Sequence, residues 1–292
     1  MTEVLELDTM PSAAGLYARA LAPLPRPEIG GGLPDRVVRL AGHRCTVADV
    51  AGYAAVCGFG LADALPPTWL HVLTFPLQLR LMTASDFPLG LAGMVHLGNT
   101  MTQHRPARIT ETLELSVRAE GPRPHRRGVL VDLVGEVRTA GELVWQGRSS
   151  YLNRQQHLPG APSTIPDADR GQPSPLDGAS PTAALWRLPA GLGRAYAAVS
   201  GDVNPIHLNP VAARAFGFPR TIVHGMWSHA RMLAALQPRL PDAYEVSVRF
   251  TKPVLLPSSV RFAAAGTDDG FTAQLTNRAA DRLHVDLTLT RR

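Results

Sequence analysis

The feature that most constrains the fold is an internal repeat. The stretch "YAAVCGF" at residues 53–59 is matched by "YAAVSGD" at residues 196–202. Downstream, "TWLHVLTFPLQLRLM" lies opposite "TIVHGMWSHARMLAAL", which aligns His71 with His224, and "HRPARITETLEL" is similar to "TKPVLLPSSVRF". Three matches in the same order are typical of a duplicated fold. The sequence therefore predicts two copies of one structural unit.

The two copies differ by a polar loop. The first match is offset by 143 residues, from Tyr53 to Tyr196, and the second match by 153 residues. The second copy therefore carries about ten residues, "VNPIHLNPVA", that the first copy lacks. Phe59 also stands where the second copy has Asp202. We interpret this difference as a polar loop that only the C-terminal copy has kept.

The chain is long enough for two domains. At 292 residues it is about twice the usual domain length of ~150 residues. A stretch rich in Pro, Gly, Ser and Asp lacks apolar periodicity and is typical of a linker. We therefore expect an N-terminal repeat at residues 1–157, this linker at 158–181 and a C-terminal repeat at 182–292.

Each half shows one apolar helix pattern followed by strand patterns. The helices are expected at residues 69–82 and 223–236. Segments with period-2 alternation follow them, such as "GVLVDLVGEVRT" in the first half and "LHVDLTLTR" in the second. This order predicts an α+β fold in which each repeat is a helix followed by an antiparallel meander. We expect the two sheets to pair edge to edge as a pseudo-dimer within the chain. The sequence does not decide whether two whole chains also form a homodimer.

Composition limits the classes of partner. The hydrophobic fraction of 45% is ordinary for a globular protein, and no apolar run reaches the ~18 residues of a membrane helix. The acidic start "MTEVLELD" lacks a secretory signal, so a cytoplasmic location is expected. Nucleic acid is not expected as a partner, because basic residues occur only in short clusters such as "RPHRR". Cys45 and Cys57 fit neither a disulfide framework nor a metal spacing, so we expect both to be buried small apolar residues.

The loop "SGDVNPIH" offers an acid–base pair. Asp202 and His207 are five residues apart, and Pro205 holds Asn204 extended, so the segment turns and can bring both side chains together. The imidazole can exchange a proton near neutral pH, while the carboxylate either fixes its tautomer or moves a second proton. The alternative is structural: Asp202 would cap a helix, and His207 would bond to a buried backbone group.

Gly225 adds a second chemical feature at the start of the long helix of the second half. Its N–H lacks an intrahelical partner at the positive end of the helix dipole, and the missing Cβ lets a ligand oxygen approach. Such a donor can stabilise an enolate. The alternative is that glycine is needed for close packing. A metal site of His207, His224 and His229 is a weaker interpretation, because the last two are five residues apart and off the i, i+4 helix face.

The segment "YAAVSGDVNPIHLNPVAARAFGFPRTIVHGM" resembles the signature of the MaoC-like (R)-specific enoyl-thioester hydratases and 3-hydroxyacyl-thioester dehydratases, also called hydratase 2. "VRFTKPVLLPSSV" is similar to the strand pair that follows in this family. The resemblance is strong over residues 196–260, whereas the first half resembles the degenerate N-terminal repeat of two-domain members only weakly. It implies a double hot-dog fold, in which each repeat is a long helix wrapped by an antiparallel sheet. One departure is Asn209, where many members carry Asp, at a position expected to be a turn or a cap.

The resemblance also implies roles for individual residues. Asp202 and His207 would be the catalytic dyad, and the Gly225 N–H would polarise the thioester carbonyl. The supporting loop would contain Ser200, Gly201, Asn204 and Pro205, and the candidates for substrate binding are His224, Met226, Phe250, Lys252, Phe59 and Leu70.

The implied reaction is the reversible syn addition of water across a trans-2-enoyl thioester, giving the (R)-3-hydroxyacyl thioester, with no cofactor and no metal. The sequence does not choose between coenzyme A and acyl carrier protein as the carrier. A non-catalytic acyl-thioester-binding or partner subunit and a hot-dog thioesterase are the alternatives. The intact dyad argues against the first, and the lack of a carboxylate in residues 223–236 argues against the second.

The ten-residue gap in the first half leaves an apolar region beside the expected site. The residues of this region are Phe59, Leu61, Trp69, Leu70 and Leu73. Each CH₂ group of an acyl chain buried there could contribute up to ~0.8 kcal/mol of binding free energy. We therefore expect enoyl thioesters of medium to long chain to be preferred over crotonyl thioester.

Overall fold

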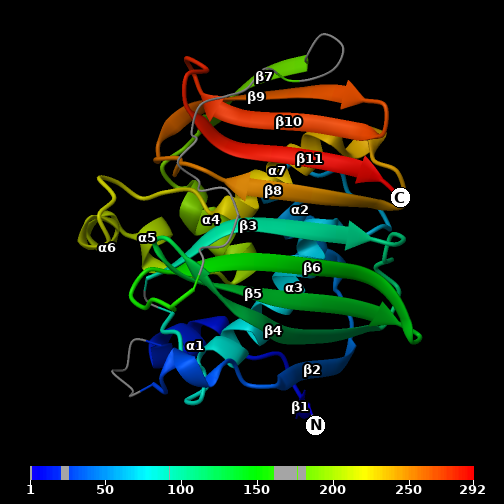
Figure 1. Ribbon diagram of the computed structural model, residues 1–292. Helices are drawn as coiled ribbons and strands as arrows, with labels where there is room; N and C mark the ends of the chain where they lie inside the picture. Colours follow the sequence, from blue (N-terminus) through cyan, green and yellow to red (C-terminus); the bar gives the residue numbers. More distant parts are fainter. Residues whose placement is uncertain (1, 21–25, 92, 161–175, 177–181) are drawn as a thin grey trace.

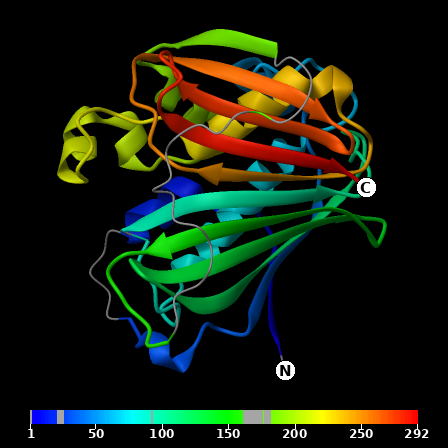
Figure 2. The ribbon, with the colours of Figure 1, turned by 45° about the horizontal axis from the view of Figure 1, so that its top comes forward.

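A computed structural model describes residues 2–20, 26–91, 93–160, 176 and 182–292. Within these residues, eleven strands form one continuous sheet, and the long helices lie against one of its faces (Figures 1 and 2). The interior between this face and the helices holds the hydrophobic core.

The strands follow the same order in both halves. Those of the first half are β1 (Glu3–Leu7), β2 (Arg36–His43), β3 (Met94–Gln103), β4 (Leu113–His125), β5 (Gly128–Thr139) and β6 (Glu142–Asn153), and those of the second half are β7 (Thr182–Leu188), β8 (Tyr244–Phe250), β9 (Ser258–Thr267), β10 (Gly270–Asn277) and β11 (Leu283–Arg291). Outward from the central β3–β8 pair, β3-β6-β5-β4-β2 on one side matches β8-β11-β10-β9-β7 on the other. Two copies of one unit would give this order. β1 adds a parallel edge strand beside β2.

Strands β3 and β8 join the two halves. They pair antiparallel, with Met101 opposite Val246. The hydroxyl oxygens of Thr100 and Ser247 lie 2.9 Å apart across the pair. Backbone pairing therefore continues from one half to the other (Figure 1).

Two long helices lie inside the sheet, α3 (Pro67–Met82) and α7 (Gly225–Leu236). Fourteen of the sixteen residues of α3 are buried, as expected for a helix that is apolar all round. It begins two residues earlier than expected, because proline is well accommodated in the first turn of a helix. α7 begins two residues later than expected. The predicted fold class, a double hot-dog α+β fold with a helix and an antiparallel sheet in each half, is confirmed.

The repeated Tyr-Ala-Ala-Val segments form equivalent helices, α2 (Val47–Cys57) and α4 (Leu192–Ser200). Each is followed by a glycine with a positive φ, 82° after α2 and 69° after α4. Glycine adopts this conformation without the steric cost that a side chain brings. The ring centroids of Tyr53 and Tyr196 lie 6.2 Å apart, so the matched segments pack against each other.

The sheet differs from the sequence prediction in two respects. First, β1, β2, β3 and β7 were not predicted. In β3, buried positions alternate only in the last half of the strand, which hides the period-2 signal. Second, the strands do not form simple meanders, because β3 and β8 pair with the last strand of their half, β6 and β11. This pairing leaves the other edge of β3 and of β8 free to form the central pair.

Two other expectations have partial outcomes. The expected linker at residues 158–181 lies almost wholly outside the described residues, so the domain boundaries stay a prediction. Cys57 is buried, Cys45 is half-buried, and both are free thiols.

Among the described helices, none is both long and apolar enough to span a bilayer.

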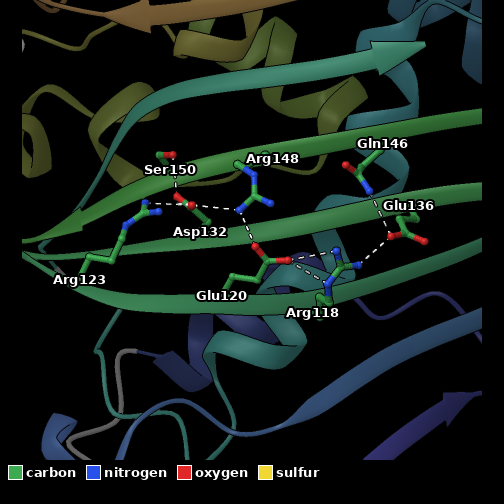
Figure 3. Close-up of polar contacts among 8 residues, drawn as sticks. All are labelled: Arg118, Glu120, Arg123, Asp132, Glu136, Gln146, Arg148 and Ser150. Carbon is green, nitrogen blue, oxygen red and sulfur yellow. Dashed lines mark hydrogen bonds and ion pairs between the residues drawn. The ribbon is translucent and has the colours of Figure 1, made fainter. Parts of the chain in front are cut away.

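The outer face of β4, β5 and β6 carries a network of ion pairs (Figure 3). Asp132, only 2% exposed, accepts hydrogen bonds from Arg123, Arg148 and Ser150 at 2.7–3.0 Å. Arg148 also pairs with Glu120 at 2.7 Å. Arg123 of the basic cluster "RPHRR" is therefore paired with a carboxylate of the same sheet.

Candidate active site

The polar loop of the second half is built around two short helices. After Gly201 the chain turns into α5 (Pro205–Leu208) and then α6 (Pro210–Ala215). The side chain of Asn204 accepts a hydrogen bond from the backbone two residues on and caps α5. Asn209 caps α6 in the same way. Both asparagines therefore hold the shape of the loop, and Asp202 caps neither of these helices, contrary to the structural alternative.

Asp202 lies just beyond α4, with its side chain 24% exposed. Its Oδ1 accepts hydrogen bonds from the Tyr17 hydroxyl at 2.6 Å and from the Asn204 N–H at 3.2 Å. Burial by itself raises the pKa of this carboxyl, but His224, His207 and the two donors together lower it below its ordinary value. Asp202 is therefore a carboxylate at neutral pH.

His207, in α5, has its Nδ1 2.8 Å from the carbonyl oxygen of Ile222. Because a carbonyl only accepts hydrogen bonds, Nδ1 must carry the hydrogen, and Nε2 keeps a lone pair. Burial lowers the pKa of His207, so the ring is neutral at neutral pH. The Ile222 carbonyl thus fixes the tautomer of His207, and Asp202 is not needed for that task. The backbone bond of the structural alternative is present, but it occupies only one ring nitrogen.

His224 connects the loop to the start of α7. Its Nε2 lies 3.0 Å from the backbone oxygen of Asp202 and 3.9 Å from the carboxylate Oδ2. Its ring stacks on that of His207, with centroids 3.7 Å apart. Burial and the neighbouring His207 lower the pKa of His224 to about 3, so it is a neutral donor. His224 therefore fixes the backbone of the loop at Asp202 and packs on the imidazole of His207.

Gly225 is the first residue of α7. Among the described residues, none accepts a hydrogen bond from its N–H, as expected at a helix start. A Cβ at this position would lie 3.1 Å from the ring of Phe250, closer than an ordinary van der Waals contact. Both interpretations from the sequence therefore apply. The glycine permits close packing, and it also leaves a donor at the positive end of the helix.

The three histidines considered as metal ligands do not come together. Ligand atoms of Asp202, His207 and His224 lie within 4.8 Å of one another, whereas His229 lies among histidines of α3 and β3. The nitrogen of each ring that bonds to a carbonyl carries hydrogen, so the lone pair of His207 is on Nε2 and that of His224 is on Nδ1. His229 does not join the other two histidines of the set considered from the sequence, and the lone pair of His207 is the one that acid–base chemistry needs.

Several other predicted residues surround the dyad. Ser200 accepts a hydrogen bond from the Asp202 N–H at 3.2 Å, and Pro205 starts α5. Phe250 is half-buried and packs beside Gly225, while Met226 is buried in α7. Lys252 is exposed, two residues beyond Phe250.

The residues expected to line an acyl pocket in the first half differ in their exposure. Leu70 is fully buried in the hydrophobic core. Phe59 is also buried and stacks on Tyr53, with ring centroids 6.3 Å apart. Leu61 is 62% exposed, so its expected place in a buried apolar region is wrong. Substrate binding at Phe59 and Leu70 stays a prediction, and neither side chain has an open surface.

Tyr17 is the site residue that the sequence did not suggest. It lies in α1 (Ala13–Ala20), 185 residues before its partner Asp202. Nothing in the surrounding "SAAGLYARA" marks a functional residue. The charge of Asp202 also affects the pKa values of His71, His96 and Tyr151. Of these three, only His71 had a signal in the sequence, namely its alignment with His224.

Comparison with known proteins covers both the site and the whole chain. The profile described as "MaoC like domain" matches residues 192–285, which include the polar loop and α7. The 3-hydroxyacyl-thioester dehydratase X of Mycobacterium tuberculosis is 41% identical over 273 residues, 93% of this chain and 94% of that protein. The crystal structure of HtdX from Mycobacterium tuberculosis matches with a TM-score of 0.76 and 38% identity, over 88% of this chain and 100% of that one.

A third relative matches a shorter segment. The (R)-specific enoyl-CoA hydratase of Aeromonas caviae is 35% identical over 91 residues. This match covers 29% of this chain and 68% of that protein. The similarity to the mycobacterial protein, by contrast, extends through both halves.

Proposed function

Because the chain belongs to the family of MaoC-like dehydratases, we propose that it catalyses the reversible hydration of trans-2-enoyl thioesters to (R)-3-hydroxyacyl thioesters. One observation carries this proposal: the carboxylate of Asp202 and the neutral imidazole of His207 lie together beside the helix start at Gly225. The names of two relatives support it, one a 3-hydroxyacyl-thioester dehydratase and the other an (R)-specific enoyl-CoA hydratase.

Activation of the substrate takes place at the start of α7. The thioester carbonyl accepts a hydrogen bond from the Gly225 N–H and lies at the positive end of the helix dipole. Polarisation of this carbonyl makes C3 of the conjugated enoyl group electrophilic. The negative charge that develops on the oxygen during addition is larger than in the substrate, so the N–H binds the enolate more tightly than the ground state.

His207 transfers the proton, and Asp202 orients the water and stabilises the charge. Water attacks C3 while Nε2 of His207 accepts one of its protons. The new C3–O bond forms as the π electrons of the double bond move to the enolate at Gly225. The imidazolium then gives its proton to C2, which restores neutral His207. Asp202 accepts a hydrogen bond from the attacking water and its charge stabilises the imidazolium. Because oxygen and proton arrive from the same side, the addition is syn.

The carrier and the chain length are finer parts of this proposal. Lys252 is exposed near Phe250, where its ammonium group can meet the phosphates of coenzyme A or of a carrier-protein prosthetic arm. A preference for medium to long acyl chains rests on the apolar surroundings of the site, where Phe250 packs beside Gly225 and Met226 is buried next to it. A thioesterase is less well supported, because α7 contains no carboxylate.

A direct assay tests the proposal. The full chain is incubated with crotonyl-CoA and with longer trans-2-enoyl-CoA esters, the loss of the conjugated double bond is followed, and the product is separated on a chiral column. We expect the (R)-3-hydroxyacyl product and a kcat/KM that rises with chain length. The (S) product would contradict the stereochemistry, and a flat or falling profile would contradict the chain-length preference. Release of free thiol without hydration would instead indicate a thioesterase.

A further inference from the structure

Helix α1 of the first half lies against the catalytic loop of the second half. The hydroxyl of Tyr17 donates a hydrogen bond of 2.6 Å to Oδ1 of Asp202. At the start of the same helix, the Cβ of Ala13 would lie only 3.5 Å from a Cβ on Gly201, the residue before Asp202. The hydrogen bond therefore joins the loop directly to the N-terminal helix, and Ala13 lies close to the backbone of Gly201.

The two oxygens of Asp202 are not equivalent in this arrangement. Oδ1 accepts from both the Tyr17 hydroxyl and the Asn204 N–H, whereas Oδ2 lies 3.9 Å from Nε2 of His224. Two donors on one oxygen prevent the carboxylate from rotating freely. Oδ2 is thereby the oxygen that remains available to a reacting water.

Tyr17 donates a hydrogen bond to Asp202 but does not give up its proton. Burial, and then the charge of Asp202, raise the pKa of the Tyr17 hydroxyl well above 10. The phenol therefore keeps its proton throughout the range in which the protein would act. Its effect on the reaction must pass through the carboxylate to which it is bonded.

We propose that Tyr17 is a positioning residue of the active site: its hydroxyl holds Oδ1 of Asp202 and directs Oδ2 toward the attacking water. This inference rests on the hydration reaction proposed above. It also means that the polar loop of the second half does not form a complete site on its own, because the first half supplies one of its hydrogen-bond donors.

The test compares Tyr17→Phe with a matched control, Tyr244→Phe. Tyr244 is also buried, at 1% exposure, and its hydroxyl has no hydrogen-bond partner among the described residues. We expect Tyr17→Phe to lower kcat about 10- to 100-fold, the effect of one hydrogen bond to a charged group. KM should change by less than about 3-fold, because the phenol does not touch the substrate. Tyr244→Phe should leave both constants close to those of the wild type.

A double-mutant cycle separates positioning from a general structural effect. If Tyr17 acts through Asp202, then Tyr17→Phe should cause little further loss of kcat in the Asp202→Asn background. A Tyr17→Phe enzyme with wild-type kcat would overturn the proposal, as would a loss of the same size in both backgrounds. These two results would reject only the role of Tyr17. If the wild-type chain hydrates no enoyl thioester, the proposed reaction and the role of Tyr17 are both rejected.

Discussion

At the scale of single residues, the chemistry depends on Asp202 and His207 acting as one unit. We predict that Asp202→Asn and His207→Ala each lower kcat for hydration by at least ~10²-fold, the usual contribution of a positioned acid–base group. Thermal unfolding should show that both variants remain folded. Asp63→Asn and His104→Ala serve as controls, because both side chains are exposed. Activity within a few-fold of wild type in either dyad variant would contradict the assignment.

The N–H of Gly225 can be tested separately from the packing of this residue. Gly225→Ala keeps the N–H and adds the Cβ that would press on Phe250. Gly225→Pro adds a similar carbon but removes the N–H, and proline is well tolerated at the first position of a helix. His224 already has the extended backbone, φ −62° and ψ 130°, that a following proline requires.

We predict that Gly225→Pro loses about 10²- to 10³-fold in kcat, as expected for the loss of an oxyanion donor. Gly225→Ala should lose much less. Equal losses in the two variants would mean that only the packing on Phe250 matters. Circular dichroism shows whether α7 is intact in each.

How far the sequence predicted the site depends on the range of each contact. Asp202, His207 and Gly225 lie within one stretch, so their residue types and spacing suggested an acid–base loop and a helix-start donor, and the resemblance to MaoC-like enzymes joined them into one site. Tyr17 reaches the same carboxylate from 185 residues away, through a helix without any functional pattern. Such a contact is determined by the packing of two halves, which a local pattern does not contain.

At the scale of elements, the two long helices explain why only one half has a complete site. α7 starts directly after His224, so the N–H of Gly225 is at the open end of the helix. α3 already starts at Pro67, before His71. The residue aligned with Gly225, Val72, therefore lies within the helix, where its N–H belongs to the internal hydrogen-bond ladder. The first half has lost the open helix start as well as the polar loop.

The elements themselves were predictable where a segment has a long apolar run or a regular apolar alternation. The two long helices and the strands β5 and β11 show strong apolar patterns, and all four were predicted. The predicted starts of the two helices are within about two residues of the observed starts. β3 was missed because its first residues are all partly exposed, without alternation. Its pairing with β6 and β8 joins segments that are distant in the sequence, so no local period could reveal it.

At the scale of the whole molecule, the central β3–β8 pair makes each half depend on the other. Separation would expose the unpaired edge of β8 and the apolar surface of α7, and it would break the bond from the Trp227 indole N–H to the Val56 carbonyl. We predict that residues 182–292 expressed alone are insoluble or associate with themselves. Size-exclusion chromatography and the hydration assay check this, with the full chain as control. A stable monomer with full activity would refute it.

Buried histidines make the whole fold sensitive to acid. Burial lowers the pKa of His71 to about 4 and those of His96, His224 and His229 to about 3. Between these values and ~6.5, the ordinary pKa, the unfolded chain binds more protons than the folded protein. The free energy of unfolding therefore falls as the pH falls through this range, by about 1.4 kcal/mol per pH unit for each histidine.

His229 provides the sharpest test of this acid sensitivity. It is fully buried, and neither ring nitrogen has a partner among the described residues. We predict that His229→Leu raises the Tm at pH 5.5 more than at pH 7.5, because one proton fewer is taken up on unfolding. His104→Ala, at an exposed site, should shift neither value. A His229→Leu variant whose Tm changes equally at both pH values would show that this histidine is not held neutral.

The continuous sheet has a consequence for how this protein can change. In a symmetric dimer of identical chains, every substitution appears in both subunits and alters both copies of the interface at once. Here the two sides of the β3–β8 pair belong to one chain, so each substitution appears once. Phe59 can be apolar although Asp202 is acidic, and Tyr17 can serve a carboxylate in the other half. Fusion thus permits a division of labour in which one half carries out the chemistry and the other is free to become its scaffold.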